Sequence, residues 1–137
     1  MARTALTGPA AKRKGTRILV QVSSYELERL DDDDSGVVQV RLTGELDLTN
    51  ARELEERLAQ IASPDVGLVI DVNRVVFVDS AALHVFFKVA RRQQSGKLVV
   101  VLEPTAPIAR AIGIVGLGQV AEIVAFADEL PSSAPRA

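Results

Sequence analysis

The sequence predicts an α/β fold: a mixed sheet with a parallel core, one antiparallel N-terminal hairpin, and helices packed on the sheet. Short β-branched runs alternate with amphipathic segments of helical period along most of the chain. Strands separated by helices need crossover connections, which join parallel strands. The two β-rich segments at 17–27 and 37–44 instead precede the first helix and are joined by a short acidic loop, which predicts the antiparallel pair.

The strands show two different patterns. The second strand alternates, with Val38, Val40 and Leu42 on one face. The third and fourth are short and densely β-branched, which is typical of strands covered on both faces. The fifth is weaker. The predicted strands are 17–27, 37–44, 68–72, 98–102 and 121–126.

Each helix is predicted from one apolar stripe and its end signals. Asn50 and Glu53 form a capping-box-like pair at the start of the first helix. Pro107 is tolerated in the first turn of the third. The helices are expected at about 50–61, 80–93 and 105–115. Their stripes are Ala51, Leu54, Leu58 and Ile61; Leu83, Phe86, Phe87 and Ala90; and Ile108, Ala111, Ile112 and Val115.

Composition limits the function classes. At 137 residues the chain predicts one domain, at 17–130, with flexible tails at 1–16 and 131–137. The net charge of −2 gives no electrostatic reason to expect nucleic acid. The chain has no cysteine, a single histidine, no apolar run of membrane-spanning length and no secretory signal, so we expect a cytoplasmic protein without a metal or cofactor.

Two weak motifs do not support a site. The acidic run that starts at Asp31 resembles a calcium loop, but its twelfth position is Leu42 rather than Glu, so a solvated hairpin loop is favoured. Ser80 and His84 are four residues apart on one helix, yet no third group is visible that could orient the histidine as a base. An enzyme is therefore not expected.

The segment FVDSAALHVFFKVARR places Asp79 and Ser80 where a strand passes into a helix. Either side chain can accept hydrogen bonds from the first helical turn, and a plain cap is the better interpretation from the residues alone. The same position would place an added phosphate beside free N–H groups and the positive end of the helix dipole. Asp79 would repel that phosphate.

Three segments resemble the STAS-domain family, most closely the anti-sigma factor antagonists of bacterial partner switching. They are RLTGELDLTNARELEERL, LVIDVNRVVFVDSAALHVF and GKLVVVLEPTAPIARAIGIVGL, and the resemblance covers roughly residues 18–127. It implies that an anti-sigma factor with serine kinase activity phosphorylates Ser80. The unphosphorylated antagonist binds that factor and frees a sigma factor, and a phosphatase acting on phospho-Ser80 resets the switch. The partner-binding residues implied are Asp47, Asp79, Ser80, Ala81, Ala82 and Leu83.

One departure from the family pattern leaves an alternative open. The family usually has a small hydroxyl residue and a glycine after the acceptor, where this chain has Ala81 and Ala82. The alternative is a STAS scaffold module that is never phosphorylated, such as a lipid-transport accessory or a stressosome-type subunit.

Overall fold

The computed structural model of the chain describes residues 24–31, 36–93 and 97–126. The predicted tails at 1–16 and 131–137, the predicted domain ends at 17 and 130, and the first part of the predicted strand 17–27 lie outside these ranges. The elements are β1 (Tyr25–Arg29), β2 (Val37–Leu46), α1 (Ala51–Ile61), β3 (Gly67–Val78), α2 (Ser80–Arg92), β4 (Leu98–Val101), α3 (Ala109–Val115), a 3-10 turn (Leu117–Gln119) and β5 (Glu122–Val124).

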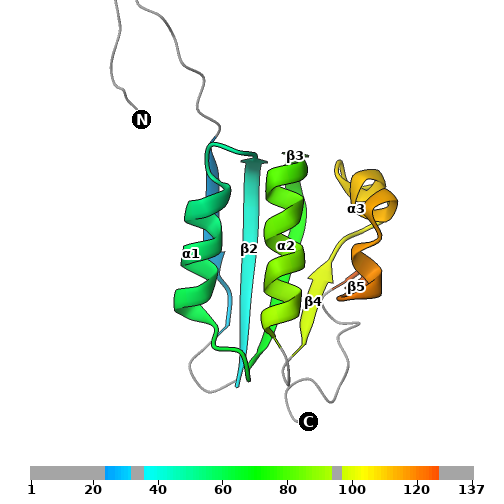
Figure 1. Cartoon of the computed structure of the whole chain (residues 1–137). Coiled ribbons are helices and arrows are strands. Elements are labelled where there is room, and N and C mark those ends of the chain that lie inside the picture. The colour runs from blue at the N-terminus through cyan, green and yellow to red at the C-terminus, as the bar shows by residue number, and fades with distance from the viewer. Residues whose placement is uncertain (1–23, 32–35, 94–96, 127–137) are drawn as a thin grey trace, which may run out of the picture.

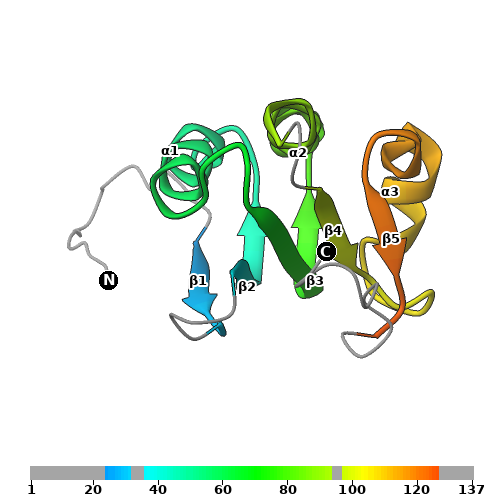
Figure 2. The same cartoon turned by 90° about the horizontal axis from the view of Figure 1, so that it is seen from below.

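The five strands form one sheet in the order β1-β2-β3-β4-β5. β1 pairs antiparallel with β2, and the three remaining pairs are parallel. Figure 1 shows α1 and α2 side by side in front of the sheet, and Figure 2 shows both over the same face. The predicted α/β fold, with its parallel core and antiparallel edge, is confirmed.

The strands contribute to the core through alternate side chains. Leu68 and Ile70 of β3 are fully buried in the large cluster under the helices. Val69, between them, belongs to a smaller cluster with valines of β4 and β5. The apolar runs of β3 and β4 therefore read as buried on both faces, as the sequence predicts.

β3 is longer than predicted, because it continues from the expected 68–72 as far as Val78. It pairs with β2 over nearly its whole length, through two register shifts, and ends with Val78 opposite Leu46. Only the first part of β3, Leu68–Asp71, pairs with β4. The extra residues bring the β3–α2 junction beside the β2–α1 loop.

The helices differ from prediction in detail. α2 buries Phe86 and Ala90 as predicted, and the other two predicted core residues, Leu83 and Phe87, are half-buried against the core. It also buries three residues that were not predicted: Ala82, Val85 and Val89. Apolar residues occupy more than one face of this helix, so periodicity alone could not orient it. α3 begins at Ala109 rather than near 105, because 103–108 form successive turns, with Ala106 N donating to Glu103 O.

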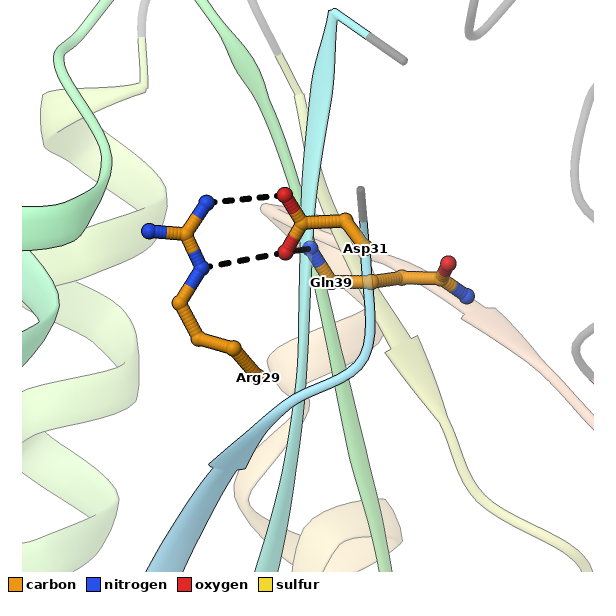
Figure 3. Close-up of polar contacts among 3 residues, drawn as sticks. All are labelled: Arg29, Asp31 and Gln39. Atoms are coloured by element: carbon orange, nitrogen blue, oxygen red, sulfur yellow. Dashed lines mark hydrogen bonds and ion pairs between the residues drawn. The ribbon is translucent and has the colours of Figure 1, made fainter. Parts of the chain in front are cut away.

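Asp31, the first residue of the acidic run, is not solvated as predicted for that loop. Its side chain is 4% exposed and accepts hydrogen bonds from Arg29 Nη2 at 2.8 Å and from Gln39 N at 3.1 Å (Figure 3). Arg29, acting through this hydrogen bond, holds the pKa of the Asp31 carboxyl below its ordinary value. The next three aspartates lie outside the described residues.

Candidate functional site

Asp79 is the N-cap of α2. Its backbone is extended, and its Oδ1 accepts a hydrogen bond from Ala82 N at 3.0 Å. Leu83 N donates to the Asp79 carbonyl at 2.9 Å, which begins the helical ladder. Of the two residues that could cap the helix, the structure thus gives the role to Asp79.

Asp79 also fixes the neighbouring β2–α1 loop. Its second carboxylate oxygen, Oδ2, accepts from Leu48 N at 3.0 Å, and its own N–H donates to Leu46 O at 3.2 Å. One side chain therefore joins the start of α2 to a loop 31 residues earlier in the chain. We call these contacts the Asp79 clasp.

The β2–α1 loop is ordered by its own polar side chains as well. Asp47 Oδ1 accepts from Thr49 N at 2.9 Å and from Thr49 Oγ1 at 2.6 Å. Asn50, which is 6% exposed, accepts from Asp47 N through Oδ1 and donates to Glu45 O through Nδ2, both at 3.0 Å. The predicted capping box is wrong, because Asn50 makes no side-chain cap bond to α1 and turns back into the loop instead.

Ser80 is the first residue of α2 and is exposed. Among the described residues its hydroxyl makes no hydrogen bond, and none joins it to the exposed His84. A serine acts as a nucleophile in its own protein only when a base removes its proton. The Ser80 hydroxyl is therefore accessible at the surface, and among the described residues no histidine is hydrogen-bonded to it.

The other predicted partner-binding residues are gathered at this junction but are unequally accessible. Ala82 is fully buried, while Ala81 and Leu83 are half-buried. Asp47 lies in the loop that the Asp79 clasp holds. The structure brings the six predicted residues to one end of the sheet, and leaves Ser80 the most open of them.

Sequence reasoning missed Leu48, whose side chain is 76% exposed beside this junction. Leu48 and Ala81 line a groove of about 560 Å³ between α1 and α2. An ion pair between Lys88 Nζ and Glu55 Oε1, at 3.0 Å, joins the two helices along this groove. The sequence does show one apolar residue inside the otherwise polar loop DLTN. A search for amphipathic patterns does not detect such a residue.

A second missed cluster supports α1 from the sheet edge. The Tyr25 hydroxyl of β1 donates to Glu53 Oε1 at 3.0 Å and accepts from Arg57 Nη1 at 3.2 Å. Burial is the main cause that raises the pKa of the Tyr25 phenol, and Glu53 raises it further, against the opposing effect of Arg57. The Glu53–Arg57 spacing is visible in the sequence, but its third member comes from another element.

Within 24–31, 36–93 and 97–126, no three acidic or histidine side chains gather to hold a metal ion. No helix in this part of the chain is long and apolar enough to cross a membrane.

The sequence and the fold agree with a known family. A family model described as "Mlab, STAS domain" matches residues 29–125, so the chain belongs to the STAS-domain family. This confirms the family resemblance predicted from the sequence. A search of curated proteins found no match.

Solved structures show the same fold. An anti-sigma factor antagonist from Mycobacterium paratuberculosis matches with TM-score 0.68 and 26% identity, over 77% of this chain and 90% of that one. The NMR structure of the protein TM1081 matches with TM-score 0.64 and 18% identity, over 90% and 100% of the two chains. The Bacillus cell fate determinant SpoIIAA in its phosphorylated form matches with TM-score 0.53 and 20% identity, over 77% and 95%.

Proposed function

We propose that this protein is an anti-sigma factor antagonist controlled by phosphorylation of Ser80. Its partner in this proposal is an anti-sigma factor with serine kinase activity. The protein binds this factor when Ser80 is unphosphorylated. A phosphatase acting on phospho-Ser80 restores binding. The protein acts in the cytoplasm and performs no catalysis of its own.

The observation that carries the proposal is that Asp79, and not Ser80, caps α2 and holds the neighbouring loop. Asp79 makes the cap and holds the adjacent loop, and in the described part of the chain no hydrogen bond involves the Ser80 hydroxyl. A group added to that hydroxyl then leaves the fold intact and changes the surface. Membership of the STAS family and the likeness to the anti-sigma factor antagonist from Mycobacterium paratuberculosis also support the role.

Electrostatics explains how phosphate would switch binding off. It adds about −1.5 to −2 charge at neutral pH. Asp79, next to it, makes no ion pair among the described residues, so the two negative groups would lie side by side without a cation. A partner that fits neutral Ser80 would have to desolvate this charge, and each 1.4 kcal/mol of that cost lowers affinity about tenfold.

The departure at Ala81 and Ala82 affects the surface less than the sequence indicates. Ala82 is fully buried, so its methyl group packs in the core and is not presented to a kinase. Only the half-buried Ala81 adds a methyl group beside the acceptor. In the proposed surface, Ala82 therefore contributes the N–H that Asp79 caps, while Asp47, Asp79, Ser80, Ala81 and Leu83 face the partner.

The test is phosphate transfer to one residue. The parent chain and Ser80→Ala are incubated with ATP and each purified anti-sigma factor kinase of the source organism, and phosphate is located by mass spectrometry. We expect stoichiometric phosphate on Ser80 of the parent and none on the variant. Phosphate on another residue, or none on the parent with any kinase, would contradict the proposal.

The second candidate is an unphosphorylated STAS scaffold module. Ala81 at the position after the acceptor, and the match to a family model described as Mlab, favour it. Two results together would favour this function instead. The parent chain would take up no phosphate, and the parent and the Ser80→Asp variant would bind the partner with equal affinity.

A further inference from the structure

Leu48 is the most exposed large apolar side chain in the described part of the chain, at 76%. A single exposed leucine is common on a protein surface and needs no explanation by itself. Leu48 differs because of how its backbone is held and what lies beside it.

The backbone of Leu48 is fixed on both sides. Its N–H donates to Asp79 Oδ2 at 3.0 Å, and the residues before and after it are tied by the Asp47–Thr49 bonds. Asn50 anchors the end of the loop to Glu45 O. A partner that covered Leu48 would not have to order this loop, so little of the binding free energy would be lost on it.

Leu48 also lies at one end of the groove between α1 and α2. The groove is lined by small apolar residues, including Ala51 and Ala81, and by charged or polar side chains of both signs. The charged and polar ones are Arg52, Glu55, Glu56, His84 and Lys88. Ala81 directly follows Ser80, so the groove is continuous with the switch residue. Lys88 and Glu55 are paired with each other along it.

We propose that Leu48 is the apolar anchor for the anti-sigma factor, which packs apolar side chains against Leu48 and the small residues of the α1–α2 groove; this inference rests on the proposed function. The contact has two parts. Leu48 and the groove supply affinity by burial of apolar surface. Ser80 permits binding when it is uncharged and prevents it when it carries a phosphate. Replacing Leu48 should therefore weaken binding to the anti-sigma factor without any change in the charge at Ser80.

The experiment compares two leucine-sized side chains of similar exposure. Leu48→Ala is matched with Ile114→Ala, since Ile114 is 73% exposed but lies on α3. Binding of each full-length variant to the purified anti-sigma factor is measured by calorimetry. We expect Leu48→Ala to weaken binding at least about tenfold, equivalent to about 1.4 kcal/mol, and Ile114→Ala to change it less than about twofold.

A second pair tests the groove away from the loop. Ala59 lines the groove on α1, whereas Gln60 is exposed beside it and does not. Ala59→Arg should obstruct the groove and weaken binding, while Gln60→Arg adds the same charge and should not. Thermal melting of all four variants checks that each remains folded.

The outcomes separate this inference from the proposed function. If Ser80→Asp loses binding while Leu48→Ala and Ala59→Arg bind as the parent does, the anchor is wrong and the switch stands. If the parent binds no anti-sigma factor, both fall. Light scattering gives the last outcome: a mass of two chains that Leu48→Ala halves would show that a second copy covers Leu48, which overturns the anchor.

Discussion

Two aspartates, Asp79 and Asp31, connect neighbouring segments of the chain through hydrogen bonds at opposite ends of the sheet. Each carboxylate accepts hydrogen bonds from two places in the chain and so fixes a connection to a neighbouring strand or helix. Asp31 joins β1 to β2 through Gln39 N, and Asp79 joins the β2–α1 loop to α2 through Leu48 N.

The difference between them is charge compensation. Asp31 faces the guanidinium of Arg29, whose Nη2 lies 2.8 Å away (Figure 3). The donors to Asp79 are backbone N–H groups, and the described residues place no cation against it. The charge of the Asp31 carboxylate is compensated by the cation that faces it, so this carboxylate serves the fold alone. The charge of the Asp79 carboxylate is not compensated in this way, so it also sets the electrostatics of the surface beside the proposed modification site, Ser80.

The largest effect on stability is expected from Asp79→Ala. It removes the cap of α2 and the acceptor for Leu48 N together. We expect the free energy of unfolding, measured in urea, to fall by about 1–3 kcal/mol.

Asp79→Asn is the matched control, because one carbonyl oxygen can replace one of the two acceptors. It should recover part of the loss. If Asp79→Ala unfolds at the parent's urea midpoint, the clasp contributes nothing and the comparison with Asp31 fails.

A smaller effect, with a distinct pH dependence, is expected from Asp31→Asn. The pKa of Asp31 lies below its ordinary value of 3.8, so the charged form is favoured in the folded state. Its contribution is therefore complete above the unfolded pKa and is lost as the pH falls through the lower folded pKa. At pH 7 we expect a loss of about 0.5–1.5 kcal/mol.

Urea unfolding of the parent and Asp31→Asn from pH 7 to pH 2.5 measures this dependence. The difference between the two should shrink below pH 3.8. Salt should reduce it as well, because the Arg29 side chain is 44% exposed and its charge is screened. A difference that grows as the pH falls has the wrong sign for this account.

The smallest effect on stability is expected from Ser80→Ala. The Ser80 hydroxyl makes no hydrogen bond among the described residues, and alanine is a good helix former. The free energy of unfolding should therefore change by less than about 0.5 kcal/mol, the range of ordinary surface substitutions. A loss comparable to that of Asp79→Ala would mean that the serine is the cap.

Local patterns in the sequence predicted the sheet, the crossovers and the position of the Asp79–Ser80 junction. They could not show which of the two residues caps α2, because both can accept a hydrogen bond from its first turn. They also gave Asn50 a cap that it does not form, since its partners Glu45 O and Asp47 N are set by the path of the loop.

Contacts between distant segments were beyond sequence reasoning for the same reason. The bond from Leu48 N to Asp79 spans 31 residues and exists only because β3 runs on beside β2 as far as Val78. No periodicity encodes that length. The exposed Leu48 was overlooked because amphipathic patterns mark buried faces and do not single out apolar residues in loops.

In the proposed switch, charge at Ser80, and not bulk, controls binding to the anti-sigma factor. Ser80→Asp and Ser80→Asn have nearly the same size and differ in charge, so calorimetric titration of both against the purified factor isolates that variable. We expect Ser80→Asn to bind within about threefold of the parent and Ser80→Asp to lose affinity about tenfold or more, equivalent to about 1.4 kcal/mol. Equal loss in both variants, or none in Ser80→Asp, would contradict it.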